Sequence, residues 1–219
     1  MYVPFVNVIS QWQTIIIFLS IASMILGAVA AIGQSNIKRL MAYSSIGHMG
    51  YALAGLAPGT NAGIQSTIIY LTIYLVMNLG AFACIFMMKR ESIFYENIKD
   101  LSGLSKNHPA LALSFLIILF SLAGIPPLAG FFAKFYVFMA VIEANMYALA
   151  IIGLVTTVVS AFYYLRIIKI IYFDKPNKPF DESYDWGLKS SLILSSILIL
   201  TYFIYPSILT NVVYSIIIY

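Results

Sequence analysis

Long apolar runs, each about as long as a lipid bilayer is thick, restrict this chain to very few folds. Residues 14–32 form one such run and contain no charged side chain. A membrane-spanning helix needs about 20 consecutive apolar residues, whereas a membrane strand would show short segments of strict alternation. Charged residues make up only 9% of the sequence, against about 25% in soluble proteins. The chain is therefore predicted to be a helical integral membrane protein.

Polar turns divide the chain into six apolar stretches. We expect an all-α, polytopic membrane protein with about six transmembrane helices, one of them discontinuous. The expected helices cover residues 12–32, 40–56, 63–88, 110–142, 147–173 and 188–217, with the fourth broken at 124–130. At 219 residues, the chain then has little room for a soluble domain.

Basic residues are sorted to one side of these six helices. Of the 12 Lys and Arg residues, all but Lys134 lie in or beside the connections that follow the first, third and fifth helices. The opposite connection regions and both termini hold none, so the positive-inside rule places both termini on the outer side and the basic end in the cytoplasm or matrix. Because the basic residues form short loop clusters between spans, we expect no nucleic-acid partner.

Residues that bind metals or cofactors are scarce in this chain. Cys84 is the only cysteine, and His48 and His108 lie far apart without metal-ligand spacing. The sequence has no Rossmann glycine fingerprint, P-loop or cysteine cluster. We therefore expect no cofactor or metal site here and no catalytic redox site in this chain.

The fourth apolar stretch is too long for one straight helix. A continuous helix over residues 110–142 would reach about 50 Å, against about 30 Å of hydrocarbon. Gly124, Pro126, Pro127 and Gly130 lie in its middle, where prolines remove backbone donors and glycines permit unusual backbone angles. Broken helices at membrane depth line polar cavities and mark ion sites in transporters.

Lys134 follows this break and is the one basic residue well inside a predicted span. Its separation from Glu143, at the outer end, is about 13 Å along a helix, which places it near the midplane. A buried charge is costly at this depth, so the lysine is suited to take up and release protons. The alternative is that Lys134 snorkels to the interface or pairs with an acid. That alternative is weaker, because the distance is long for a lysine and the spans offer no acid.

His48 is the second titratable residue near mid-depth, and histidine titrates close to physiological pH. It is either a proton relay or a packing residue among small neighbours, and the sequence favours neither. Tyr74 and Asn78, four residues apart, form a polar stripe that more often serves helix packing than proton transfer. The residues of a possible polar axis around His48 are Ser44, Ser45, Tyr51, Tyr74 and Asn78.

Two long segments resemble a known family. Residues 34–51 are similar to the signature of the antiporter-like membrane subunits of respiratory complex I, the NADH-quinone oxidoreductase, and residues 122–136 are similar to its broken-helix signature. Residues 77–82 and 163–166 resemble subunit N in particular. The resemblance covers nearly the whole chain and weakens after about residue 173.

The resemblance implies a fold of about fourteen helices in two inverted repeats, of which residues 1–219 would be the C-terminal part. Lys134 matches the lysine of the family's broken helix, in a proton half-channel that opens outward. Asn78 replaces a lysine of related subunits, which argues against a direct role there. NADH, FMN, iron–sulfur clusters and quinone are expected in other subunits. The implied partners are other membrane subunits, the lipid bilayer and protons, in a bacterial inner or mitochondrial inner membrane.

Other titratable residues of the family lie on helices that have no counterpart in this sequence. This chain alone should then not form a complete proton path, so it is a fragment or truncated product, or a partner chain supplies the first half. The expected function is proton translocation coupled to quinone reduction elsewhere in the complex. One alternative is a subunit of a cation/proton antiporter or membrane-bound hydrogenase, which residues 77–82 and 163–166 disfavour. Another is a structural piece that does not pump.

Overall fold

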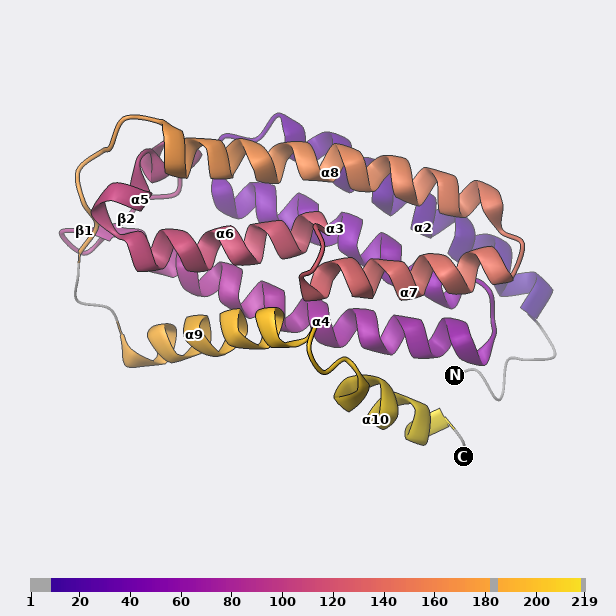
Figure 1. Ribbon diagram of the computed structural model, residues 1–219. Coiled ribbons are helices and arrows are strands. Elements are labelled where there is room, and N and C mark those ends of the chain that lie inside the picture. Colours follow the sequence, from indigo (N-terminus) through magenta and orange to yellow (C-terminus); the bar gives the residue numbers. More distant parts are fainter. Residues whose placement is uncertain (1–8, 182–184, 218–219) are drawn as a thin grey trace.

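Helices make up most of the structure, a computed structural model that describes residues 9–181 and 185–217 (Figure 1). The longer helices are α2 (Ile9–Ile32), α3 (Ile37–Leu56), α4 (Asn61–Phe86), α6 (Pro109–Ala123), α7 (Ala129–Glu143), α8 (Tyr147–Phe173), α9 (Trp186–Thr201) and α10 (Ser207–Ile217). Between α4 and α6 lie the short elements β1 (Lys89–Arg90), β2 (Ile93–Phe94), η2 (Ile98–Leu101) and α5 (Leu104–Asn107). The strands β1 and β2 pair antiparallel.

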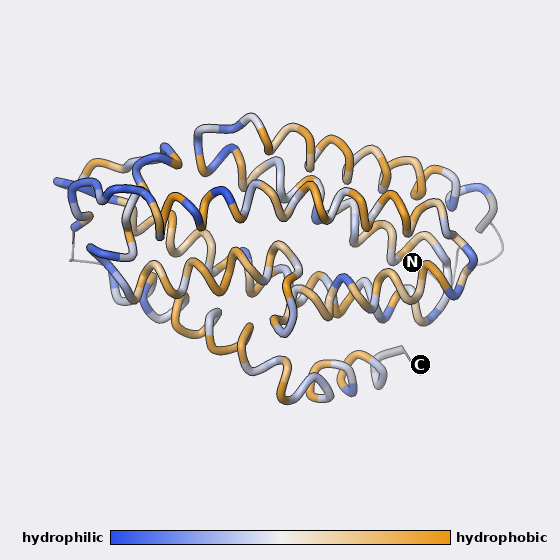
Figure 2. Tube along the Cα trace, turned by 45° about the horizontal axis from the view of Figure 1, so that its top comes forward, coloured by the Kyte–Doolittle hydropathy of each residue, from blue (hydrophilic) through white to orange (hydrophobic). Residues whose placement is uncertain are grey.

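Within the described residues, three helices are long and apolar enough to cross a membrane: Gln11–Ile32, Asn61–Phe86 and Tyr147–Phe173. The segments Pro109–Ala123 and Trp186–Thr201 are shorter apolar helices. Figure 2 shows hydrophobic residues along the length of the bundle and hydrophilic residues gathered towards its ends, most densely at the end that holds β1 and β2. Helices with apolar residues on all sides are typical of a bundle whose flanks face lipid.

Polar caps set where two of the helices begin. The Asn36 side chain accepts a hydrogen bond from Arg39 N at 3.0 Å, and the Thr60 hydroxyl accepts one from Gly63 N at 3.1 Å. Such side-chain oxygens satisfy the free backbone donors of a first helical turn. Because the capping residues stand in polar turns, α3 and α4 begin slightly before the apolar stretches that predicted them.

The expected single helix over residues 188–217 is wrong. The structure has two helices there, because α9 ends at Thr201 and α10 begins at Ser207. Pro206 lies between them, and a proline inside a helix removes a donor and clashes with the carbonyl four residues before it. In Figure 1, α10 diverges from the direction of α9. The last apolar stretch is therefore discontinuous, like the fourth.

The helices α2 and α3 approach each other closely because glycines lie at their contact. A Cβ on Gly27 would lie 2.4 Å from the backbone nitrogen of Gly47, and one on Gly50 would lie 2.8 Å from that of Met24. The Ser20 hydroxyl also donates to Gly50 O at 2.7 Å. Small residues permit such close backbone packing in membranes. The glycines on either side of His48 thus serve the helix contact.

The basic connections lie together at one end of the bundle. Ile37 N donates to Glu96 O at 2.8 Å, which joins the α2–α3 turn to the α4–α6 connection. Asp181 N donates to Lys89 O at 2.8 Å, which joins the segment after α8 to β1. The charge sorting seen in the sequence therefore corresponds to one physical end of the molecule.

The carboxylate of Glu96 ties two of these connections together. Its two oxygens accept hydrogen bonds from Lys38 Nζ at 2.6 Å and from Asn36 Nδ2 at 2.9 Å. The hydrogen bonds from Lys38 and Asn36 lower the pKa of Glu96 below its ordinary value of 4.5. A carboxyl group whose pKa is lowered in the folded state stabilises the fold above the unfolded pKa. That contribution is lost as the pH falls through the folded pKa.

We expect the Glu96→Gln variant to have a slightly lower thermal midpoint than the wild type at neutral pH, since exposed ion pairs contribute little. The difference should begin to shrink as the pH falls below 4.5 and should vanish below the lowered pKa of Glu96 in the folded state, where the wild-type carboxyl is neutral too. Thermal unfolding of the purified protein from neutral to acidic pH measures this, with Glu91→Gln on the neighbouring exposed turn as the control. A difference that stays constant at all pH values would contradict the prediction.

Candidate functional site

The segment between α6 and α7 ends one helix and starts the next in the middle of the bundle. Gly124 has φ +85°, a left-handed angle that favours glycine at a helix end. Pro126 and Pro127 have no N–H with which to continue a helix. Gly130 N donates to the Ser121 hydroxyl at 3.0 Å, so a side chain of α6 satisfies a donor in the first turn of α7. The two half-helices are thus held together across the break.

Lys134 occupies the space that this break creates. Its side chain is only 5% exposed. Its Nζ donates to Leu122 O at 3.1 Å and to Ala123 O at 3.3 Å. These carbonyls belong to the last turn of α6, where carbonyl groups lack helical partners and the helix dipole is negative. The end of a helix, instead of an acidic side chain, therefore stabilises the ammonium.

The two alternatives for Lys134 do not match this geometry. The ion pairs among the described residues are Lys38–Glu96 and Lys169–Asp174, and both lie at the basic end of the bundle. The Lys134 side chain also turns inward to α6, so it does not extend towards an interface. Gly124 makes room for it, because a Cβ there would lie 3.2 Å from Lys134 Cδ.

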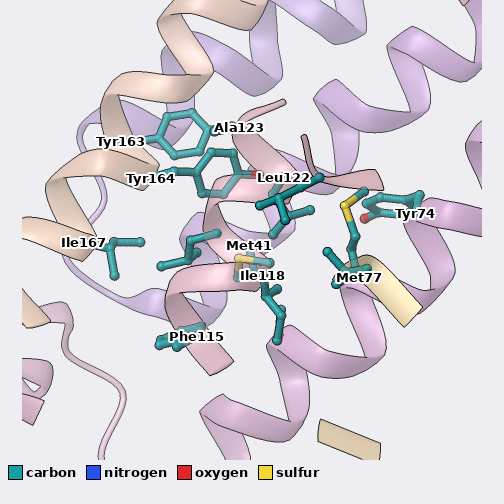
Figure 3. Close-up of a cluster of buried hydrophobic side chains, with 14 of the residues drawn as sticks. Met41, Tyr74, Met77, Phe115, Ile118, Leu122, Ala123, Tyr163, Tyr164 and Ile167 are labelled. Carbon is teal, nitrogen blue, oxygen red and sulfur yellow. The ribbon is translucent and has the colours of Figure 1, made fainter. Parts of the chain in front are cut away.

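His48 stands at the centre of a second polar group. It is 3% exposed, its Nδ1 lies 2.7 Å from the Tyr70 hydroxyl, and its Nε2 lies 3.2 Å from the Tyr164 hydroxyl. The Tyr164 hydroxyl also forms a hydrogen bond with the Ser44 hydroxyl. Figure 3 shows Tyr164 of α8 near the end of α6, close to Leu122. The group thus connects α3, α4 and α8 next to the break.

Of the two residues that form the polar stripe on α4, Tyr74 belongs to the group around His48 and Asn78 does not. The Tyr74 ring stacks on His48 with 4.8 Å between ring centroids, and its hydroxyl donates to the Ser45 hydroxyl at 2.8 Å. The Oδ1 atom of Asn78 is buried and has no hydrogen-bond partner within the described residues. Tyr74 and Asn78 both line a groove of about 560 Å³ on α4. The other lining residues are Leu71, Leu75, Leu79, Phe82 and Phe86.

Tyr51 lies beside both titratable residues. Its ring centroid is 5.1 Å from Lys134 Nζ and 6.1 Å from the centroid of the His48 ring. Its hydroxyl lies 3.2 Å from the Thr156 hydroxyl and accepts a hydrogen bond from Thr157 at 3.1 Å. The residues expected to form one polar axis therefore lie in separate hydrogen-bonded groups around the Tyr51 ring.

Four residues of this arrangement were missed in the sequence: Tyr70, Tyr164, Thr156 and Thr157. A signal for them exists, because polar residues recur at helical spacing within apolar spans. Tyr70 precedes Tyr74 by four positions, and Thr156 precedes Tyr164 by eight. Such spacing places side chains on one helix face.

The His48 group gives a test of its hydrogen bonds. We expect His48→Leu to destabilise the protein by about 1–3 kcal/mol, because the Tyr70 hydroxyl would be left buried without its partner. Adding Tyr70→Phe should cost less than the sum of the two single variants, since the unpaired hydroxyl is then removed. Thermal unfolding of the wild type, both single variants and the double variant measures the coupling. Strict additivity would show that the two side chains do not interact.

Chemically, the site combines a buried lysine, a buried histidine and many hydroxyl groups in the middle of an apolar bundle. Among residues 9–181 and 185–217, no three His, Cys, Asp or Glu side chains gather to hold a metal ion. The groups present can bind, hold and release protons. The arrangement is that of an apolar helix bundle whose buried lysine lies beside a break between two helices.

Residues 1–160 match the family described as NADH:quinone oxidoreductase/Mrp antiporter, TM. The chain belongs to this family and is an integral membrane protein.

Curated relatives point to one subunit type. The chain is 68% identical over 213 residues to NADH-quinone oxidoreductase subunit N of Pelagibacter ubique, covering 97% of this chain and 45% of that protein. It is 51% identical over 208 residues to the subunit of the same name from Rhodospirillum rubrum, covering 95% of this chain and 43% of that protein. The chain thus spans less than half the length of these relatives.

Solved structures agree with the fold. A chain of respiratory complex I from Thermus thermophilus with bound aureothin has a TM-score of 0.79 and 32% identity, over 90% of this chain and 45% of that chain. A chain of the Mrp complex from Dietzia has a TM-score of 0.83 at 21% identity, over 93% of this chain and 46% of that chain. At that identity the Mrp likeness concerns the fold alone.

Proposed function

We propose that this chain forms part of the proton-translocating membrane subunit of an NADH-quinone oxidoreductase, with Lys134 as its proton carrier. The observation that carries this proposal is the placement of the Lys134 ammonium. It is buried beside the break and held by two carbonyls at the end of α6. Similarity to subunit N over almost the whole chain supports the choice of complex.

The surroundings of Lys134 suit a group that changes its protonation state. Burial disfavours the ammonium, whereas the negative end of α6 and the Tyr51 ring favour it. With these effects opposed, the ammonium can give its proton to water on one side, and the neutral amine can take another proton from the other side. His48 and its tyrosine partners form the second place where a proton can reside.

The proposed membrane placement follows from the charges. The helices would cross the bilayer as the second half of an antiporter-like fold, with the α6–α7 pair and the α9–α10 pair as discontinuous crossings. The basic end would face the cytoplasm, and both termini of the chain the outside. The relatives above are bacterial, which favours a bacterial inner membrane.

Other membrane subunits and further helices of the assembly are the proposed partners. The groove on α4 supports this, because its leucines and phenylalanines are apolar while Asn78 Oδ1 within it lacks a donor. A neighbouring helix with a donor side chain would satisfy that atom. We place NADH, FMN, iron–sulfur clusters and quinone on other subunits, and derive no redox step in this chain.

Membrane vesicles from cells with and without the gene test this function. We expect loss of the gene to lower the protons translocated per NADH oxidised, and complementation to restore it, with a pH-sensitive dye and NADH absorbance as readouts. Native electrophoresis checks that the complex assembles. If NADH-driven pumping stayed normal while sodium-driven proton exchange was lost, the antiporter alternative would replace the proposal. If neither changed in the assembled complex, the chain would be a structural piece.

A further inference from the structure

We infer that Tyr51 is a positioning residue, whose ring keeps the Lys134 ammonium at the end of α6 and separates it from His48. This inference rests on the proposed role of Lys134 as a proton carrier. It assigns to Tyr51 a function different from that of a link in a chain of hydrogen bonds.

The ring of Tyr51 adjoins both titratable residues. The Lys134 Nζ lies 5.1 Å from the ring centroid, a distance at which an aromatic face attracts a cation. The His48 ring meets the Tyr51 ring edge to face, with 6.1 Å between centroids and 70° between planes. The ring is therefore next to both titratable groups, as the proposed separating role requires.

The hydroxyl of Tyr51 forms its hydrogen bonds with α8 and not with Lys134 or His48. It bonds with Thr156 and Thr157 of α8. Thr156 itself donates to Gly153 O at 3.0 Å, and the single hydroxyl hydrogen of Thr157 is shared between the Tyr51 hydroxyl at 3.1 Å and Gly153 O at 2.9 Å. These bonds fix the hydroxyl to α8, so it does not reach the Lys134 ammonium or the His48 ring nitrogens in this arrangement.

Neighbouring aromatic side chains also pack against the Tyr51 ring. Phe138 of α7 packs against it with 6.1 Å between centroids and 87° between planes. Tyr70 lies 6.2 Å from it on the α4 side. Contacts from α4, α7 and α8 therefore fix the orientation of a residue that α3 carries. A ring so constrained holds a cation in one place at little cost in conformational entropy.

Two hydrogen-bonded groups result, one on each side of Tyr51. Lys134 bonds only to Leu122 O and Ala123 O among the described residues. His48 bonds to Tyr70 and Tyr164. A proton that passes between Lys134 and His48 must therefore wait for Tyr51 to move or for water to enter. The ring thereby limits direct leakage and keeps the ammonium in place until then.

The test compares ring-keeping and ring-removing variants in the complete complex, reconstituted in vesicles with NADH and quinone. Tyr51→Phe keeps the ring and should retain most proton pumping per electron. Tyr51→Leu and Tyr51→Met remove the aromatic face and should lower pumping per electron about threefold or more, with electron transfer maintained. The ring-removing variants should also increase the passive proton leak of the vesicles. If Tyr51 had only a structural role, its replacement would lower assembly and electron transfer together. The number of protons pumped per electron transferred would then stay the same.

Two further variants make the outcome decisive. Thr157→Val removes one of the two side-chain partners of the hydroxyl, so its effect should lie between the wild type and Tyr51→Phe. Lys134→Met reports on the proton carrier itself. If Lys134→Met stops pumping while Tyr51→Leu and Tyr51→Met pump normally, the positioning role is wrong and the proposed function stands. If all pump normally, both are wrong. If the Tyr51→Leu complex does not assemble, Tyr51→Met supplies the measurement. If neither variant assembles while Tyr51→Phe does, the ring has a structural role and the inference is wrong.

Discussion

Replacing Lys134 with methionine should stop proton pumping by the assembled complex without preventing its assembly. Methionine has a similar length and no charge, so the space beside Gly124 stays filled. The carbonyls of Leu122 and Ala123 lose a donor, but they sit at a helix end where carbonyls lack helical partners in any case. Replacement of a buried charge by an apolar group of similar volume is often close to neutral for stability. The expected loss is therefore one of function.

The measurement is proton uptake by membrane vesicles during NADH oxidation, with quinone reduction followed in parallel. Lys169→Met is the matched control, because Lys169 pairs with Asp174 near the end of α8 and is largely exposed. We expect the control to pump normally. Normal pumping by an assembled Lys134→Met complex would show that Lys134 carries no protons, and the break between α6 and α7 would then need a purely structural explanation.

The bundle was largely predictable because each helix leaves a local trace in the sequence. Apolar runs indicated the helix interiors, whereas the caps at Asn36 and Thr60 start α3 and α4 a few residues before the expected positions 40 and 63. The wrong prediction of one helix over residues 188–217 came from hydropathy alone, which does not register where the backbone lacks a hydrogen-bond donor. Pro206 lies in an apolar stretch and was passed over, although its missing donor divides α9 from α10.

The site was predictable only where its cause is local. Lys134 was found because a lysine in an apolar stretch is costly, and because it follows two prolines. The partners of His48 were not found, since Tyr70 and Tyr164 lie 22 and 116 positions away from it in the sequence. Which hydroxyl reaches which ring nitrogen depends on how α3, α4 and α8 pack. No spacing within one helix contains that information.

A methyl group on Gly130 should destabilise the break more than any other single small change in the site. A Cβ there would lie 1.9 Å from Ser121 O and 2.7 Å from its carbonyl carbon. Both are backbone atoms of α6, so a side-chain rotation cannot relieve the clash. The half-helices would have to separate, which would break the bond from Gly130 N to the Ser121 hydroxyl. Since Lys134 Nζ is bonded to α6 while its backbone belongs to α7, its contacts would be lost as well.

We expect Gly130→Ala to cost about 3 kcal/mol, or about 6–12 °C in thermal midpoint for a protein of this size. Gly33→Ala is the matched control, because nothing lies within 4 Å of a Cβ at that position. Its midpoint should stay close to that of the wild type. Thermal unfolding of the purified protein in detergent compares the three. If Gly130→Ala were as stable as Gly33→Ala, α6 and α7 would be able to move apart freely, and the carbonyls at the end of α6 could not hold the Lys134 ammonium in a fixed position. The proposed fixed position of Lys134 thus depends on rigid contact between α6 and α7, and this variant tests both.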